Sequence, residues 1–325
     1  MKREDFDYLQ STLPPGLKGV FKGPEQRYRF RNEDAAEILA TKAAKKALDK
    51  ANLSPSDIDY IISGNTGGKY VLPMVGCYVH NKLGFRKETP VLNVATCCSS
   101  FIDAFEVAWN YIIAGKYKKI LVVMSSAWET SGGGGRIDLT DFTGVLMGDG
   151  AAAAIVSSEN LKCEFITYHN RTFGELYDLC YCAPKGPVHA EMRQAKDQPA
   201  IGNYLFTAPE FLPYWAEHAE GFGIEGIQGA LKQANLPLKA IDTVLFHQPF
   251  DMLYDMWMEG AAKAGLSKDK WKHTWQKYGN LSNVVIPVNL AEFSEKGELK
   301  KDSIIALLAI GAGFHAPTML IRWLA

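Results

Sequence analysis

One helix-turn-strand signature occurs twice in this sequence, and the repeat restricts the fold more than any other feature. The segment "ANLSPSDIDYIISGN" at 51–65 aligns without a gap with "ANLPLKAIDTVLFHQ" at 234–248. Further along, "KYKKILVVMSS" in the first half corresponds to "LKKDSIIALLAIG" in the second. The same signature twice in the same order indicates gene duplication. The alternative is that "ANL" followed by Pro and "ID" is simply a common helix-to-strand connector.

Strands alternate with helices in the pattern of apolar residues. The stretches "DIDYIISGN", "PVLNVAT" and "KKILVVMSS" read as short buried strands, and "FIDAFEVAWNYIIAGK" reads as a helix between the last two. This alternation is typical of an α/β protein whose sheets are covered on both faces. The sequence therefore predicts two similar α/β halves, one over 1–160 and the other over 161–325.

Composition excludes several classes of function. The 325 residues are 47% hydrophobic, enough for a large core, and the formal net charge of -1 provides no global field for nucleic acid or an anionic membrane. The longest apolar runs, such as "IIALLAIGAGF" at 304–314, are shorter than the ~20 residues that cross a bilayer. The N-terminal "MKREDFDYLQ" lacks the apolar region of a secretory signal. We therefore expect a cytoplasmic protein with no nucleic-acid or membrane partner.

The six cysteines are predicted to be free thiols. Neighbours in sequence such as Cys97 and Cys98 do not easily bridge each other, and a reducing cytoplasm opposes disulfides. The spacing "CYC" at 180–182 has no matching Cys or His pair for a zinc site. We expect no metal site, and we treat one or more thiols as candidates for reactivity.

Three residues stand at comparable places in the two halves. Cys98 lies where "LNVAT" runs into a helix, His247 follows the repeated strand "DTVLF", and Asn280 lies near the corresponding junction of the second half. A Cys at a helix N-terminus is either buried filler or a nucleophile whose thiolate is favoured by unpaired N–H groups. Because such junctions in α/β proteins point to one face, one cleft is predicted to hold all three side chains.

Five motifs, taken together, resemble the thiolase superfamily and within it the β-ketoacyl-ACP synthase III group. They are "NVATCCSSFIDA", "GVLMGDGAAAAIV", "VLFHQPFD", "KYGNLSN" and "IGAGFHAPTMLIRW", in the order in which that family carries them. The resemblance runs from about residue 25 to the C-terminus. It implies a thiolase-like α/β fold in which two duplicated halves form α-β-α-β-α layers.

The resemblance assigns catalytic roles to matching positions. Cys98, and not Cys97, falls on the nucleophile that accepts an acyl group from a thioester, while Cys97 is expected to point away into the core. His247 and Asn280 fall on the pair that stabilises the enolate formed when a malonyl unit loses carbon dioxide. The backbone N–H groups of Cys98 and Ala312 would form the oxyanion hole for attack on the acyl-Cys carbonyl.

Substrate-binding positions follow from the resemblance and from an aromatic-rich stretch. Leu72 corresponds to a residue that family members insert into the acyl tunnel of the partner subunit, which implies a homodimer. Phe206 and Trp215 flank or lie in "TAPEFLPYWAEHAEGFGIEG" and are candidates for the acyl pocket, although an aromatic cluster also suits a core. Phe250 and Ile310 complete the candidate substrate-binding set.

Two positions differ from the family pattern. Phe250 stands where the family commonly has an Asn that helps to hold the pantetheine arm, and Met252 stands where synthase III proteins carry an Arg that contacts acyl carrier protein. The sequence therefore leaves open whether an acyl-CoA or an acyl-carrier-protein thioester is the donor. No permanently bound cofactor is expected.

The resulting expectation is a β-ketoacyl synthase III-like enzyme that acts in fatty acid initiation or in specialised polyketide-type biosynthesis. An acyl group would move from a thioester to Cys98 and then undergo decarboxylative Claisen condensation with a malonyl-type thioester. One alternative is an acyltransferase that passes the acyl group to an oxygen, nitrogen or aromatic carbon nucleophile. A further alternative is a non-catalytic partner subunit of a homologous synthase.

Overall fold

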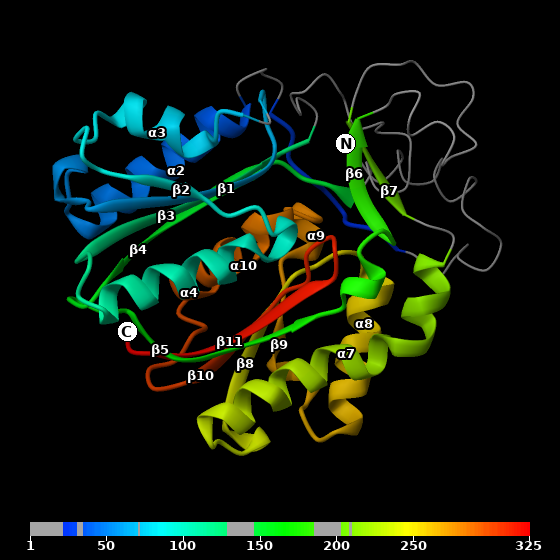
Figure 1. The fold of residues 1–325 in the computed structure, drawn as a ribbon. Coiled ribbons are helices and arrows are strands. Elements are labelled where there is room, and N and C mark those ends of the chain that lie inside the picture. The colour runs from blue at the N-terminus through cyan, green and yellow to red at the C-terminus, as the bar shows by residue number, and fades with distance from the viewer. Residues whose placement is uncertain (1–21, 31–34, 71, 129–145, 185–202, 208–209) are drawn as a thin grey trace.

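The computed structural model describes residues 22–30, 35–70, 72–128, 146–184, 203–207 and 210–325. Of residues 181–184 and 203–207 it describes only the main chain. Figure 1 shows two central sheets, one above the other, with helices on both outer faces and between them. The predicted α/β fold of two duplicated halves in α-β-α-β-α layers is confirmed.

The first sheet is built entirely from the first half of the chain, in the strand order β2-β1-β3-β4. Its strands are β1 (Tyr60–Gly67), β2 (Val91–Asn93), β3 (Lys119–Ala127) and β4 (Gly150–Ser157). β1 pairs in parallel with β2 and β3, and β4 is antiparallel to β3. Every residue of β3 after Lys119 is buried, which is the pattern of a strand covered on both faces.

The second sheet repeats this arrangement in the order β9-β8-β10-β11, with β5 added at the β11 edge. Its strands are β5 (Cys163–Thr172), β8 (Ile241–Phe246), β9 (Trp271–Lys272), β10 (Ile304–Leu308) and β11 (His315–Trp323). β8 pairs in parallel with β9 and β10, and β11 is antiparallel to β10. The boundary proposed at residue 160 therefore lies between the segments that form the two sheets.

The repeated "ID" dipeptide has the same structural role in both halves. Asp59 Oδ2 accepts the backbone N–H groups of Lys118 at 2.9 Å and Lys119 at 3.1 Å, where β3 begins. Asp242 Oδ2 accepts the N–H of Ile304 at 2.9 Å, where β10 begins. Each carboxylate thus fixes the start of the neighbouring parallel strand, which explains why both copies keep an Asp at this position.

Helices fill three layers around the two sheets (Figure 1). The outer face of the first sheet carries α2 (Ala35–Ala51) and α3 (Val75–Leu83), and the outer face of the second carries α7 (Phe211–Ala234) and α8 (Asp251–Lys263). Between the sheets lie α4 (Ser100–Ile113) and α10 (Val285–Glu295), which pack with both sheets in one apolar core. The middle layer therefore brings the N-termini of two equivalent helices into the interior.

The remaining elements are short. A two-stranded sheet pairs β6 (Cys180–Pro184) with β7 (Asn203–Thr207), and α9 (Trp275–Tyr278) precedes the turn that leads to α10. Two single 3-10 turns, Cys97–Ser99 and Ser282–Val284, run directly into α4 and α10. No helix in the described part of the chain is long and apolar enough to cross a membrane.

Candidate active site

The turn before α4 brings both cysteine side chains into one cavity. Cys97 has a φ of 55°, a left-handed conformation that costs a residue with a Cβ about 1–2 kcal/mol. This kink breaks the alternation that a strand would impose, so consecutive side chains no longer face opposite ways. Cys97 and Cys98 consequently line the same cavity. The prediction that Cys97 points away into the core is therefore wrong.

The cavity has a volume of about 90 Å³ and gathers most of the predicted site residues. His247, Asn280 and Ala312 line it together with the two cysteines. Most of the other described walls are apolar, and they are Trp128, Leu146, Met147, Cys180, Phe211, Trp215, Pro249, Phe250, Leu253, Ile310, Gly311 and Phe314. The site thus combines a few polar groups with a largely apolar surface, as small-molecule sites commonly do.

The two thiols form a coupled pair. The Sγ atoms of Cys97 and Cys98 lie 3.7 Å apart, and Cys98 Sγ also lies 3.2 Å from the Ser282 hydroxyl oxygen. The hydrogen bond from Cys98 is the largest effect that lowers the pKa of Cys97, and the N–H groups of Ala312 and Cys98 add to it. The same hydrogen bond and burial raise the pKa of Cys98. The pair therefore titrates in coupled steps, with the pKa lowered at Cys97 and raised at Cys98, whereas the sequence suggested a lowered pKa at Cys98.

His247 and Asn280 meet through a hydrogen bond. His247 Nε2 lies 3.3 Å from Asn280 Oδ1, which also accepts the backbone N–H of Ser282 at 2.7 Å. The Ser282 N–H fixes the orientation of the amide, so the NH₂ group of Asn280 is its donor end, with one N–H donated to the Pro249 carbonyl oxygen at 3.3 Å and the other left for a ligand. Burial lowers the pKa of His247 to about 4, with the Asn280 bond opposing the shift. The imidazole is therefore neutral near pH 7 and offers an N–H without an excess charge.

The loop between β10 and β11 carries Ala312 against the cysteine turn. A Cβ on Gly311 would lie 2.1 Å from the Thr96 carbonyl oxygen and 3.1 Å from Ser99 Oγ, so only glycine permits this close approach. The Ala312 N–H lowers the pKa of Cys97, which indicates that it is directed toward the thiols. The N–H groups of Cys98 and Ala312 thus both point toward the Cys97 sulfur and into the same part of the cavity.

An aromatic cluster forms one wall of the cavity. The Trp215 and Phe314 rings stack with centroids 5.6 Å apart, and Phe211 packs edge-on to Trp215 and Phe314 and at a tilt to Phe250. Trp215 is 3% exposed and belongs to the core of the second half as well as to the cavity wall. Both sequence-based interpretations of the aromatic stretch, pocket and core, therefore apply to this residue.

Two predicted substrate residues are not part of the described cavity. Leu72 lies just before α3 with 79% of its surface exposed. Phe206 belongs to β7, and its side chain is outside the part that the structure describes. Among the described residues no group of three or more His, Cys, Asp and Glu side chains is placed to hold a metal ion.

Sequence reasoning missed Ser282, which touches Cys98. The available sign was the repeat, because Ser282 stands at the junction before α10 as Cys97 does before α4, and the structure gives the two residues similar φ values of 53° and 55°. It also missed Asp103 and His315, which form a polar network beside the cysteine turn. A single acid in the apolar stretch "SSFIDAF" was the available sign of a buried partner.

Comparisons with known proteins agree with the fold. Two models of one family match the chain: 3-oxoacyl-[acyl-carrier-protein] synthase III over residues 92–174 and its C-terminal part over 231–323. Beta-ketoacyl-[acyl-carrier-protein] synthase III of Fusobacterium nucleatum is 30% identical over 325 residues, which cover 98% of this chain and 93% of that protein.

Solved structures show the same architecture. The crystal structure of 3-oxoacyl-[acyl-carrier-protein] synthase III from Aquifex aeolicus superposes with a TM-score of 0.79 at 26% identity, covering 98% of this chain and 94% of the other. Cerulenin-bound OleA from Xanthomonas campestris superposes with a TM-score of 0.78 at 21% identity, covering 99% and 92%, and supports the fold alone.

The layered fold and these likenesses define an enzyme of the thiolase superfamily. The chain belongs to the β-ketoacyl-[acyl-carrier-protein] synthase III family of condensing enzymes, and it is accordingly an acyltransferase.

Proposed function

We propose that this enzyme transfers an acyl group from a thioester to Cys98 and condenses it, with loss of carbon dioxide, with a malonyl-type thioester. The observation that carries the proposal is the convergence of Cys98, His247, Asn280 and Ala312 on one cavity with mainly apolar walls. A thiol supplies the covalent step, and two neutral donors supply the stabilisation that an enolate requires. In this proposal Cys98 is the nucleophile, His247 and Asn280 stabilise the enolate, and the N–H groups of Cys98 and Ala312 form the oxyanion hole.

Acyl loading uses the thiol pair. The two sulfurs lie 3.7 Å apart, and in this proposal the reacting pair carries one proton, which Cys97 holds as the Cys98 sulfur attacks the thioester carbonyl. The tetrahedral intermediate places its oxyanion at the N–H groups of Cys98 and Ala312, which no longer face a charged Cys97 sulfur. Collapse breaks the bond to the donor thiolate, which takes the proton back from Cys97 and leaves as a thiol. The products are acyl-Cys98 and the free donor thiol.

Condensation uses the second half of the site. His247 turns its Nε2–H from Asn280 Oδ1 to the thioester carbonyl oxygen of the malonyl unit, and the Asn280 NH₂ group donates to the same oxygen. These two bonds stabilise the enolate formed as the carboxylate leaves as carbon dioxide. A His whose pKa is lowered to about 4 stabilises this oxygen without protonating the carbanion. The carbanion then attacks the acyl-Cys98 carbonyl, and Cys98 departs from the β-keto product as a thiolate, after which the thiol pair takes up one proton from solvent.

The substrate class follows from the cavity walls. Trp215, Phe250 and Ile310 line the cavity, which suits an apolar acyl group. Phe250 and Met252 replace the polar contacts that the resemblance led us to expect, so both a coenzyme A and an acyl-carrier-protein thioester are kept as donors. Leu72, with 79% of its surface exposed, is proposed to enter the partner subunit of a homodimer. The division at residue 160 and a cytoplasmic location remain predictions from the sequence.

Intact-protein mass spectrometry tests the proposal. Wild type and Cys98→Ala are incubated with a panel of acyl thioesters of coenzyme A and of acyl carrier protein, and malonyl thioester is then added. We expect a mass increase in the wild type alone, followed by its discharge with release of a β-keto product. The exposed thiol variant Cys77→Ala serves as the matched control and should load like the wild type. Equal loading of Cys98→Ala and the wild type contradicts the proposal.

Simple acyl transfer is the second candidate function, because the cysteine turn alone suffices for loading. It predicts that malonyl thioester does not discharge the acyl-enzyme, whereas an alcohol, amine or electron-rich aromatic compound does. The placement of Asn280 within 3.3 Å of His247 favours condensation, since an acyl transfer to oxygen or nitrogen needs no enolate.

A further inference from the structure

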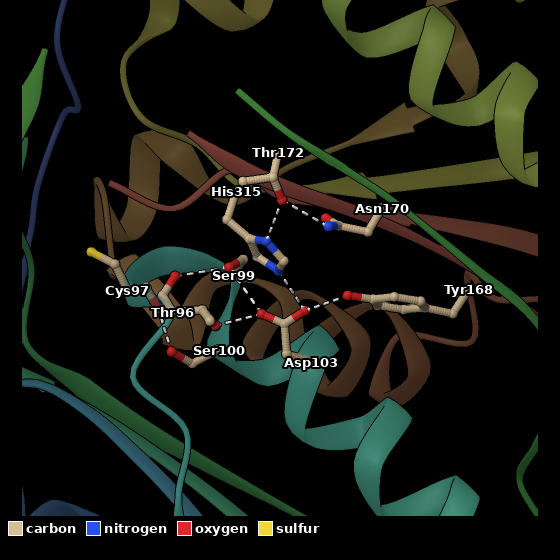
Figure 2. A network of polar contacts seen from close by, with 9 residues as sticks. All are labelled: Thr96, Cys97, Ser99, Ser100, Asp103, Tyr168, Asn170, Thr172 and His315. Carbon is tan, nitrogen blue, oxygen red and sulfur yellow. Dashed lines mark hydrogen bonds and ion pairs between the residues drawn. The ribbon is translucent and has the colours of Figure 1, made fainter. Parts of the chain in front are cut away.

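One buried carboxylate connects the two backbone segments that supply the proposed oxyanion hole. Asp103 lies in the first turn of α4, and its side chain is 11% exposed. It accepts hydrogen bonds from the hydroxyl groups of Thr96 and Ser99, the latter at 3.1 Å. Its other partners are His315 Nε2 at 3.1 Å and the Tyr168 hydroxyl at 2.8 Å. Figure 2 shows these side chains around the carboxylate.

The first side of the network fixes the cysteine turn. Thr96 precedes Cys97 and Ser99 follows Cys98, so the carboxylate is bonded to both ends of the turn. Ser99 Oγ also lies 2.8 Å from the Thr96 carbonyl oxygen, and this closes the turn further. The positive φ of Cys97 is a strained conformation, which persists only where the surroundings hold it.

The second side of the network fixes the loop that carries Ala312. His315 is the first residue of β11, and its carbonyl oxygen accepts the Gly311 N–H at 2.8 Å. The His315 ring is held from both edges, because Nδ1 lies 3.1 Å from Thr172 Oγ1 while Nε2 faces Asp103 (Figure 2). The end of the loop is thereby tied, through the ring, to the carboxylate that holds the cysteine turn.

The carboxylate remains ionised near neutral pH. Burial raises the pKa of Asp103, but hydrogen bonds from His315, Thr96 and Tyr168 outweigh burial and bring the pKa below its ordinary value. Hydrogen bonds to an ionised acceptor are about twice as strong as those between neutral groups. The link between the turn and the loop is therefore made of strong, directional contacts.

We propose that Asp103 is a positioning residue that holds the N–H groups of Cys98 and Ala312 at the separation required by a single oxyanion. This proposal rests on the proposed acyl transfer to Cys98 and deepens it. Asp103 is not among the described residues that line the cavity, so it acts through Thr96, Ser99 and His315. Catalysis by an oxyanion hole depends on donors that are already in place, and a small displacement of either donor weakens it.

The test compares two reactions of Cys98. Acylation by p-nitrophenyl acetate develops an oxyanion and is independent of any carrier, whereas thiolation by methyl methanethiosulfonate develops none at a carbonyl. Thr96→Val removes one of the two bonds to the cysteine turn, where only the longer Ser99 bond remains, and His315→Leu removes the bond to the loop. Each should slow acylation about tenfold or more while changing thiolation less than about twofold. Because both act through one carboxylate, the double variant should be little slower than the slower single variant. Fragment-resolved mass spectrometry assigns each modification to Cys98 or Cys97.

Two further variants separate positioning from stability. Tyr168→Phe removes a hydrogen bond to the same carboxylate without touching either loop, so it should lower the melting temperature and leave the ratio of the two rates unchanged. His315→Gln keeps a donor near the position of Nε2 and should recover much of the acylation rate lost in His315→Leu.

Unchanged rate ratios in folded Thr96→Val and His315→Leu overturn the proposal. It is also overturned if Tyr168→Phe lowers the ratio as much as they do, because that result assigns the network a general structural role. Failure of the proposed function gives a different result. In that case wild type forms no acyl-Cys98 with any thioester, while the p-nitrophenyl acetate comparison still reports on the oxyanion hole.

Discussion

The turns before α4 and α10 follow the same backbone path and carry different chemistry. In the first, Thr96 at φ −93° precedes Cys97 at φ 55°, and in the second, Leu281 at φ −88° precedes Ser282 at φ 53°. Each turn is one 3-10 unit that runs directly into a helix of the middle layer. Duplication has therefore preserved a strained turn twice, while one copy holds thiols and the other holds an amide and a hydroxyl.

The two turns differ in how they are anchored. Asp103 lies six residues after Cys97 and bonds back to its turn, whereas the residue six after Ser282 is the apolar Val288. In the second turn the anchor is local, since Asn280 Oδ1 accepts the Ser282 N–H at 2.7 Å. The comparison indicates that the turn proposed to form a covalent bond is held by a side chain from the following helix, Asp103. The turn proposed only to donate hydrogen bonds is held by a neighbouring side chain of the same segment, Asn280.

The largest effect is expected from Gly311→Ala, which separates the Ala312 loop from the cysteine turn. The new Cβ would lie 2.1 Å from the Thr96 carbonyl oxygen, so one of the two segments has to move. We expect acyl loading to fall about a hundredfold or more, the scale of losing one oxyanion donor. Rapid-quench mass spectrometry of the acyl-enzyme measures this rate.

Gly313→Ala is the matched control for that variant. A Cβ on Gly313 meets no atom within 4 Å, but its φ of 87° makes alanine strained there. This variant should lose roughly 1–2 kcal/mol of stability and much less loading activity than Gly311→Ala. Equal loss of loading in the two variants would show that backbone strain, and not contact between the segments, controls the site.

A smaller effect is expected on stability from Asp103→Asn, which removes the charge from the anchor of the first turn. Replacement of a buried charged acceptor should lower the free energy of unfolding by about 1–3 kcal/mol at pH 7. The pKa of Asp103 is lowered in the folded protein, so its contribution is present above the ordinary value of 3.8 and is lost as the pH falls through the folded pKa. Urea unfolding at several pH values should show a difference between wild type and variant that shrinks below pH 3.8. A difference that grows on acidification contradicts the assigned ionisation.

The last variant, Cys97→Ala, leaves a single thiol in the first turn, so acyl loading should slow for want of the proposed proton acceptor, while Cys98 thiolation should change only in its pH profile. The hydrogen bond with Cys97 is the largest effect that raises the pKa of Cys98, so its removal should move the pH profile of Cys98 thiolation to lower pH. In the wild type, Cys97 should react at lower pH than Cys98 because its pKa is lowered. Residue-resolved rates with methyl methanethiosulfonate measure both profiles. A Cys98 profile that stays in place, or that moves to higher pH, excludes the thiol pair as the cause.

Much of the fold was predictable because the duplication can be recognised from short stretches of sequence. The aligned "ID" dipeptides predicted equivalent strands, and Asp59 and Asp242 indeed fix equivalent strand starts. Cys98, His247 and Asn280 could be placed near each other because α/β junctions share one face. The inward turn of Cys97 was not predictable, because it depends on one positive φ imposed by the surroundings.

Contacts between residues far apart in the sequence were the second feature that could not be predicted. Asp103 and His315 are separated by more than two hundred positions and meet only because β11 returns beside α4. The residues around Asp103 give no sign of a contact with His315, and the reverse also holds, so no local pattern predicts this pair. The acidity of Cys98 was misjudged for a related reason, since the helix N-terminus is visible in the sequence but the orientation of the Cys97 thiol is not.

A crossed measurement tests most directly the division of chemistry between the two turns. Acyl loading and release of carbon dioxide from malonyl thioester are measured in Cys98→Ala and in Asn280→Ala. We predict mirror-image results: Cys98→Ala loses loading and keeps slow carbon dioxide release, and Asn280→Ala keeps loading and loses carbon dioxide release. Loss of both reactions in each variant, or of loading in Asn280→Ala alone, would contradict two turns with separate roles.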